Sequence, residues 1–270
     1  MYNFKCPIYL LLSFLIPALT YGGEILLQST TSTKNSGFYT HIIPKFKNIT
    51  GISVKVVAVG TGQAIKNAEN CDADILIVHA KKAEEEFVAN GNGIIRHDLM
   101  YNDFVIIGPN ADPAEVNKSQ TILESLQAIF DLEASFISRG DNSGTHKKEL
   151  ELWEKVGISI KEYSGKWYKE TGSGMGTTLN IAAELDAYTI SDRATWLTFN
   201  NKRTLKILFE GDRLLFNQYG AVIVNPKKCP KTKVKEAGLF LNWLLSENGQ
   251  SEIRNYTVNG IQLFYPNAMR

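Results

Sequence analysis

The sequence predicts an α/β fold made of two lobes that face each other across a cleft. Residues 25–88 alternate apolar, strand-like runs with helical patterns, which is typical of a parallel sheet covered by helices. Two later apolar runs, near Phe104 and near Tyr219, divide the chain into outer parts and a middle part. If both runs cross between the lobes, they form two hinge crossings. The boundaries that follow are 23–104 together with 217–270 for lobe 1, and 105–216 for lobe 2.

The first part of the chain has a regular alternation of patterns. Strands are expected at 25–28, 54–59 and 75–78, and helices from 36 past 43, at 64–69 and at 81–88. Pro44 can interrupt the first of these helices, because proline lacks the backbone donor. The glutamates at 84–86 indicate a solvated helix face. His79 follows the third strand, and we interpret it as a structural histidine rather than a catalytic one.

The middle and last parts contain further strand and helix patterns. Strands are expected at 100–109, 187–190, 205–209 and 221–224, and helices at 121–130, from the loop at 138–145 through 156, at 177–185 and at 234–254. In the helix at 121–130, Ile122, Leu126 and Ile129 fall on one face. The chain ends with a short apolar run at 261–265.

The first 22 residues have the features of a secretory signal peptide. Lys5 is their one charged residue, an apolar run fills 8–19, and small residues precede the expected cleavage near Gly22 or Gly23. The apolar run is short for a membrane span. We therefore expect a signal peptide at 1–22 and a periplasmic mature chain with no membrane span. An uncleaved anchor is the alternative.

Charge and cysteine content narrow the classes of function. The chain has 29 Lys and Arg residues and 28 acidic residues, so loss of Lys5 leaves 28 against 28. A neutral chain lacks the basic surface that nucleic-acid binding requires, and we expect no nucleic-acid partner. Cys71 and Cys229 remain, and the sequence leaves open whether they pair, since a disulfide needs Cα atoms within about 7 Å. No spacing typical of a metal site is present.

The segment FISRGDNSGTHKKE, at 136–149, indicates ligand chemistry. It consists of an apolar run ending at Ser138, a polar loop and a helix. A helix N-terminus attracts anions through unpaired N–H groups and a partial positive charge, and Arg139 adds a permanent cation with a planar fork of donors. Asp141 is an acceptor that can hold the guanidinium in place. The alternative is an ordinary surface strand–turn–helix.

Four turns share this chemistry, at 29–33, 60–63, 138–145 and 191–193. Each follows a strand and supplies hydroxyls, glycine backbone or arginine, and ligands in such sheets bind at the carboxyl ends of strands. A lining of donors suits an oxyanion without a proton, such as tungstate, molybdate or sulfate. Hydrogen phosphate also requires an acceptor, and we expect Asp141 to be occupied by Arg139.

A family resemblance extends over almost the whole mature chain. Its segments, in chain order, are TTSTKNSG at 30–37, VGTGQAI at 59–65, DADILIVHA at 72–80, MYNDFVIIGP at 100–109, FISRGDNSGTHKKE at 136–149, WYKETGSGMGTTLNIA at 167–182, AYTISDRATW at 187–196 and NQYGAVIVNP at 217–226. Through them the chain resembles the periplasmic tungstate-binding proteins of ABC transporters. The SRGDNSGT stretch is also similar to the anion loop of phosphate-binding proteins. Ser29, Cys71 and Ala194 depart from residues frequent in the family, and none of these departures removes a donor.

The resemblance implies a type II periplasmic-binding fold, with two mixed sheets flanked by helices, and a receptor rather than an enzyme. It implies no catalytic residue, no cofactor and no metal site. The implied ligand is tungstate or molybdate, and the implied partners are a permease and its ATPase; we expect a monomer. The implied oxyanion-binding residues are Thr30, Thr31, Ser32, Thr61, Gly62, Ser138, Arg139, Ser143, Gly144, Thr145 and Arg193. For Arg193, pairing with Asp192 or bracing the cleft is the alternative.

Three other functions remain open from the sequence. The first is a phosphate or sulfate receptor of the same fold. The second is an exported hydrolase that uses Ser143 and His146, although Ser143 lacks a Gly-x-Ser-x-Gly context and His146 has no evident orienting partner. The third is a sensor or assembly module that has this fold and no transporter.

Overall fold

The computed structural model describes residues 22–268, so the predicted signal peptide, apart from Gly22, lies outside the described residues. The strands are β1 Glu24–Thr30, β2 Ser53–Val59, β3 Ile75–Val78, β4 Gly93–Pro109, β5 Phe136–Ser138, β6 Tyr168–Glu170, β7 Thr189–Asp192, β8 Leu205–Phe209, β9 Phe216–Val224, β10 Thr257–Val258, β11 Ile261–Gln262 and β12 Tyr265–Pro266. The α-helices are α1 Thr31–Asn35, α2 Phe38–Thr50, α3 Thr61–Glu69, α4 Lys81–Ala89, α5 Ile122–Asp131, α6 Gly144–Val156, α7 Met175–Glu184, α8 Arg193–Thr198, α9 Val234–Leu245 and α10 Glu247–Arg254. Three short 3-10 helices are η1 Val116–Lys118, η2 Ile160–Tyr163 and η3 Arg213–Leu215.

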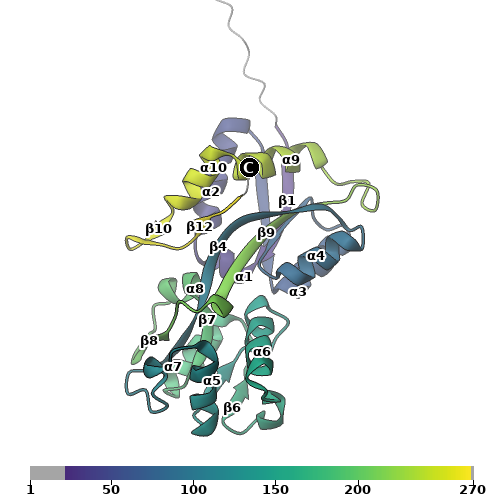
Figure 1. Cartoon of the computed structure of the whole chain (residues 1–270). Helices are drawn as coiled ribbons and strands as arrows, with labels where there is room; N and C mark the ends of the chain where they lie inside the picture. Colours follow the sequence, from purple (N-terminus) through teal and green to yellow (C-terminus); the bar gives the residue numbers. More distant parts are fainter. Residues whose placement is uncertain (1–21, 269–270) are drawn as a thin grey trace, which may run out of the picture.

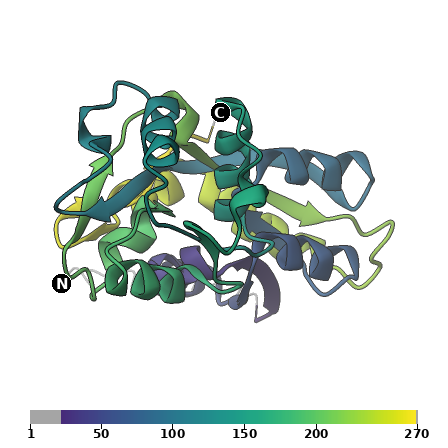
Figure 2. The same ribbon diagram turned by 90° about the horizontal axis from the view of Figure 1, so that it is seen from below.

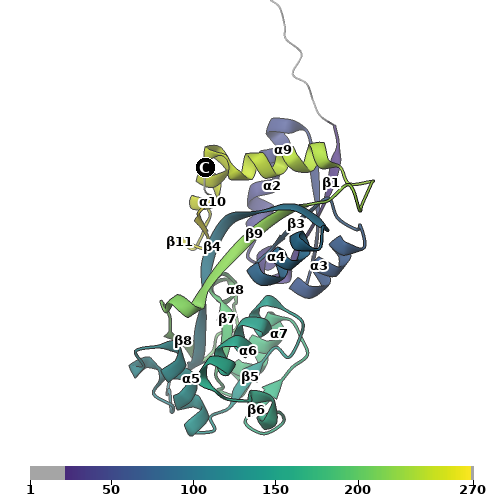
Figure 3. The ribbon, with the colours of Figure 1, turned by 45° about the vertical axis from the view of Figure 1, so that its right-hand side comes forward.

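The chain forms two lobes that are joined by β4 and β9 (Figures 1 and 3). One lobe contains the first and last parts of the chain, and the other contains the middle part. Figure 2 looks along the long axis, with the middle part of the chain in front. In β4, the residues up to Asp103 pair with β9, whereas Phe104–Ile107 pair with β7. One long strand therefore belongs to the sheets of both lobes.

The sheets are mixed rather than wholly parallel. Strand β1 lies between β2 and β3 and runs parallel to both, as the alternating pattern at 25–88 predicts. Strand β9 then pairs antiparallel with β3 and with β4. Strands β7 and β8 are antiparallel to β4, and β5 pairs parallel with β6. The carboxyl ends of β1, β2 and β3 consequently lie at one edge, where parallel sheets bind ligands.

Both faces of the first lobe's sheet are covered by helices. Within β3, Ile75 and Ile77 join one apolar cluster, and Leu76 and Val78 join another. This four-residue strand is buried on both faces, which explains its unbroken apolar sequence.

The middle lobe has separate apolar clusters of its own. One of them contains Phe136, Trp153 and Tyr168, and the Phe136 and Trp153 rings pack edge to face with centroids 5.5 Å apart. Ala194 of α8 is an exception, because it packs into the cluster of the first lobe. Helix α8 is therefore in contact with both lobes.

A disulfide joins Cys71 to Cys229, whose Cα atoms lie 5.3 Å apart. Cys71 follows α3, and Cys229 lies in the connection between β9 and α9. The question that the sequence left open is thus answered: the two cysteines pair, and the pair links the first and last parts of the chain within one lobe.

Several predicted boundaries are wrong in detail. Helix α2 continues through Pro44 without ending there. The single helix predicted at 234–254 is two helices, because Ser246 is extended (φ −70°, ψ 165°) and its Oγ accepts from Gly249 N (3.3 Å) to cap α10. Strand β4 begins at Gly93 rather than near residue 100. The prediction missed its first half because Arg96 and Asp98 interrupt the apolar pattern there.

The expectation of a fully solvated glutamate run at 84–86 is also wrong for Glu84. This side chain is buried and accepts from Arg96 Nε (2.7 Å) and from Ala80 N (2.7 Å). Burial raises the pKa of Glu84 to about 7, against the opposing effect of Arg96. Glu85 and Glu86 are exposed, as predicted. Among the described residues, no helix is long and apolar enough to cross a membrane.

Candidate functional site

The first group of predicted donors lies where β1 passes into α1. Thr30 Oγ1 accepts from Thr33 N to cap the helix, and it lies 2.7 Å from Thr33 Oγ1 and 3.1 Å from Ser32 Oγ. Thr30, Ser32 and Thr33 are buried, and Thr31 is half-buried. The hydroxyls are therefore concentrated at the carboxyl end of β1.

The second and third groups of donors meet each other across the lobes. Gly62 N, at the start of α3, donates to Asn142 O (3.1 Å), and Gly144 N, at the start of α6, donates to Thr61 Oγ1 (3.1 Å). A Cβ on Gly62 would lie 2.1 Å from Asn142 Nδ2, so only glycine allows the two loops to approach this closely. The first turns of two helices, one from each lobe, are thus in direct contact.

Arg139 is the cation of this region. Its side chain is buried, with the residue only 4% exposed, and its Nη2 donates to Asp141 Oδ2 (2.6 Å). Its buried Nε has no hydrogen-bond partner among the described residues. A buried, charged donor without a partner is rare in folded proteins, and this N–H group is chemically able to donate to a ligand.

The backbone of Arg139 is fixed by the glycine-rich segment at 171–176. Thr171 N donates to Ser138 O (3.0 Å), Thr171 Oγ1 to Arg139 O (3.2 Å), and Ser173 N to Arg139 O (3.2 Å). This segment therefore positions the loop from behind. Sequence reasoning gave it no such role.

The remaining predicted residues of this loop differ in their availability. Ser143 caps α6, because its Oγ accepts from His146 N (3.1 Å), and Thr145 is buried in the first turn of that helix. Ser138 Oγ donates to Glu149 Oε2 (2.8 Å). The Ser138 hydroxyl proton is therefore already used inside the protein.

His79 joins the groups of donors, and sequence reasoning did not assign it to the site. Its Nε2 lies 3.4 Å from Ser32 Oγ, and its Nδ1 donates to Asn217 Oδ1 (3.0 Å). Asn217 Nδ2 in turn donates to Asn102 Oδ1 (2.7 Å). This orientation of the Asn217 amide makes its Oδ1 the acceptor and His79 Nδ1 the donor. The position of His79 directly after β3, at the same sheet edge as the two hydroxyl turns, was the signal that could have identified it.

The charge state of His79 follows from its surroundings. Burial lowers the pKa of His79, and Arg139 acts in the same direction, while Asp192 and the Asn217 hydrogen bond oppose them. A neutral ring that donates from Nδ1 has a lone pair on Nε2. Ser32 Oγ is placed to donate to that lone pair.

The loops of the 30s, 60s and 140s therefore converge, since a Cβ on Gly144 would lie 3.0 Å from His79 Cε1 and 3.1 Å from Thr61 Oγ1.

Arg193 has other partners: its Nε and Nη2 donate to Asp103 (2.6 Å each), and it also pairs with Glu210. Its predicted alternative partner, Asp192, instead caps α8 by accepting from Thr195 N (2.9 Å). Arg193 thus braces β4 against its neighbours.

The geometry does not support a nucleophilic serine at position 143. His146 directs its ring Nδ1 toward Ser138 Oγ (3.1 Å) and lies 3.8 Å from Glu149 Oε2, away from the cap that Ser143 makes. His146 therefore does have a carboxylate neighbour, contrary to the sequence-based expectation, but it belongs to a buried network that also includes Tyr168.

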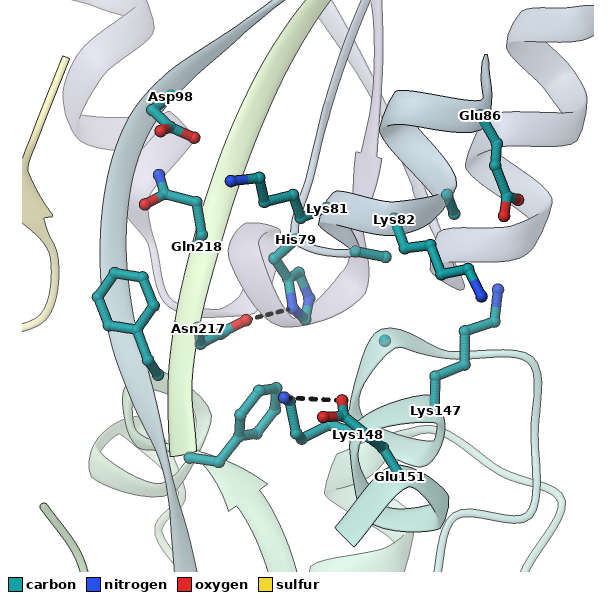
Figure 4. A pocket seen from close by; sticks show the side chains of 15 residues that line it. His79, Lys81, Lys82, Glu86, Asp98, Lys147, Lys148, Glu151, Asn217 and Gln218 are labelled. Atoms are coloured by element: carbon teal, nitrogen blue, oxygen red, sulfur yellow. Dashed lines mark hydrogen bonds and ion pairs between the residues drawn. The ribbon is translucent and has the colours of Figure 1, made fainter. Parts of the chain in front are cut away.

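A cavity of about 770 Å³ lies beside the converging loops (Figure 4). His79, Gly144 and Asn217 line it together with residues of α4 and α6, so it is bounded by both lobes. Of the predicted ligand residues, Gly144 lines this cavity, and Ser32 and Thr61 adjoin its wall through their contacts with His79 and Gly144.

Comparisons with known proteins agree with this architecture. Residues 19–248 match a family profile described as PBP superfamily domain. The chain is 47% identical to the tungstate-binding protein TupA of Peptoclostridium acidaminophilum over 252 residues, which cover 92% of this chain and 87% of that protein. It is 37% identical to the TupA of Campylobacter jejuni, over 88% of each chain. The solved tungstate-binding protein TupA of Desulfovibrio alaskensis superposes with a TM-score of 0.81 at 48% identity, covering 92% of this chain and all of that one. The predicted two-lobed α/β fold class is confirmed, and the chain belongs to the PBP superfamily domain family.

Proposed function

We propose that this chain is an extracytoplasmic solute-binding protein that captures tungstate, and also molybdate, between its lobes and delivers it to an ABC transporter permease. Similarity to proteins named for tungstate binding supports the choice of ligand. The solved tungstate ABC transporter protein of Geobacter sulfurreducens, 45% identical with a TM-score of 0.79, supports the transport role. The lobes of this proposal are 23–104 with 217–270, and 105–216, and the receptor acts as a monomer and catalyses no reaction.

The buried Arg139 guanidinium carries this proposal. A cation in an environment that excludes water requires a compensating negative charge, and Asp141 supplies one carboxylate to Nη2. The unpartnered Nε remains for a second anion. The hydroxyls of Thr30, Thr31, Thr61, Ser143 and Thr145 are proposed to complete the set of donors.

Five predicted ligands of the anion have a reduced role in this arrangement. The Ser32 hydroxyl faces His79 Nε2, Gly62 N donates to Asn142 O, and Gly144 N donates to Thr61 Oγ1, so these three residues shape the donor loops rather than bind the anion. The Ser138 hydroxyl already donates to Glu149, so Ser138 acts mainly by holding the loop. Arg193 pairs with Asp103 and Glu210 through its Nε and Nη2, so it acts by bracing β4.

The state of the acceptors favours an anion without a proton. Asp141 Oδ2 accepts from Arg139 Nη2, and its Oδ1 accepts from Ser143 N (3.3 Å). His79 Nε2 faces the Ser32 hydroxyl. The Asp141 carboxylate and the His79 ring nitrogen are therefore occupied, and a proton of hydrogen phosphate that found neither acceptor would be left unpaired at a cost of about 1–3 kcal/mol.

Isothermal titration with tungstate, molybdate, sulfate and phosphate tests the proposal. We expect tight binding of tungstate, comparable binding of molybdate because the two anions have nearly the same size, and phosphate affinity lower by about 10- to 100-fold. Phosphate binding as tight as tungstate binding would refute the assignment and favour the phosphate receptor. No binding of any of the four anions would refute the oxyanion receptor altogether.

A further inference from the structure

The cavity beside the anion site has a second feature that the proposed function does not use. Its volume of about 770 Å³ is far larger than a tetrahedral oxyanion of five heavy atoms needs, since cavities of this size hold whole drug-sized ligands. Its inner wall includes His79, Gly144 and Asn217, the residues that separate it from the buried donors. The cavity therefore adjoins the loops that carry those donors.

Four lysines line this cavity, two from each lobe. Lys81 and Lys82 belong to α4, and Lys147 and Lys148 belong to α6. Lys148 pairs with Glu151 (2.9 Å), and Lys81 lies 3.9 Å from Glu85. Lys82 and Lys147, by contrast, have no ion-pair partner among residues 22–268. In Figure 4 their side chains extend toward one another from opposite walls.

The acidic residues of the lining do not neutralise these two lysines. Asp98 pairs with Arg96, and Glu151 pairs with Lys148. Glu86 also lines the cavity, but it forms no ion pair within 4.0 Å of either lysine among the described residues. Among residues 22–268, the cavity lining thus holds two lysines and one carboxylate without an ion-pair partner, which leaves an excess of one positive charge.

We infer that Lys82 and Lys147 are steering residues that draw the anion into the cleft and raise its rate of association. Charges at the mouth of a cleft raise the local concentration of an oppositely charged ligand, and charges at a rim act on association rather than on dissociation. The two lysines line the cavity and do not belong to the buried donors, so they do not hold the bound anion. This inference rests on the proposed function.

The test is stopped-flow binding of tungstate to the full mature chain, followed by tryptophan fluorescence at about 20 mM and about 300 mM salt. The variant Lys82→Gln/Lys147→Gln removes two positive charges. We expect its association rate at low salt to fall by about 3- to 10-fold, its dissociation rate to stay within about 2-fold, and the difference from wild type to shrink at high salt, where the Debye length is short.

The matched control is Lys47→Gln/Lys206→Gln, which makes the same change in net charge with one exposed lysine from each lobe, both away from the cavity. Its association rate should match that of the wild type. An equal fall in the control, or a rise in the dissociation rate of the cavity variant without a fall in association, would overturn the inference. If the cavity variant binds tungstate with the association rate of the wild type, the steering role is wrong and the proposed function stands. If the wild-type chain does not bind tungstate, the proposed function is wrong as well.

Discussion

Replacement of Arg139 by alanine is the most informative perturbation of the site. The residue is only 4% exposed, and it contributes one unpartnered donor and a unit positive charge. A charge-assisted hydrogen bond contributes about 1.5–3 kcal/mol, and a unit charge pair 4 Å apart contributes about 4 kcal/mol at an effective dielectric constant of 20. Allowing for overlap between the two, we expect a loss of about 4–6 kcal/mol, which is about 10³- to 10⁴-fold in tungstate affinity.

The assay is isothermal titration of tungstate, with circular dichroism to verify the fold of each variant. Arg139→Lys keeps the charge but loses the planar fork, so its affinity should lie between those of the wild type and the alanine variant. Arg203→Ala is the control, because it removes an exposed arginine of the same lobe that pairs with Glu184. A folded Arg139→Ala variant with affinity within about 10-fold of wild type would show that the anion binds elsewhere.

Three further predictions concern closure and stability. Gly62→Ala should weaken tungstate binding about 10-fold in titration, because its Cβ meets Asn142 Nδ2, and adding Asn142→Ala should restore affinity; no rescue would contradict the clash. Cys71→Ser should lower the free energy of unfolding in urea by about 3–5 kcal/mol, because the disulfide closes a sequence separation of 158 residues. The wild type unfolded with a reductant should show the same lower stability. Equal stability of the oxidised wild type, the reduced wild type and the variant would refute this. Because burial raises the pKa of Glu84 from 4.5 to about 7, folding takes up a proton between these values, so the free energy of unfolding should fall by up to about 3 kcal/mol from pH 4.5 to pH 7. Glu84→Gln should remove this part of the pH dependence in urea titrations, and an unchanged profile would contradict it.

The sequence was sufficient to predict the fold class and the convergence of three loops. Apolar runs interrupted by hydroxyl- or glycine-rich turns located β1 and β2, and parallel strands bring their carboxyl ends to one edge whatever the details of the helices. The pairing of Asp141 with Arg139 was also predictable, because the two residues are close in sequence and complementary in charge.

The remaining features depend on contacts between distant parts of the chain, which local patterns do not encode. His79 binds Asn217 across 138 positions, and Arg193 binds Asp103 across 90. From the local sequence, Glu84 belongs to a run of solvated charges. In the fold, Arg96 of β4 contacts it, and this tertiary contact accounts for its burial. Each of these residues has a short-range interpretation that is reasonable by itself, and the tertiary partner overrides it.

The antiparallel pairing of β4 with β9 constrains how the lobes can move. The two crossings are hydrogen-bonded to each other through the pairs from Met100 with Tyr219 to Asp103 with Phe216, so they must bend together as one ribbon and cannot slide independently. This geometry favours a single rotation axis over a loose set of orientations. Asn217 belongs to this ribbon and also holds His79. A bend of the ribbon therefore moves the His79 imidazole, which lies beside Ser32. The relative orientation of the two lobes and the arrangement of the donors consequently change together.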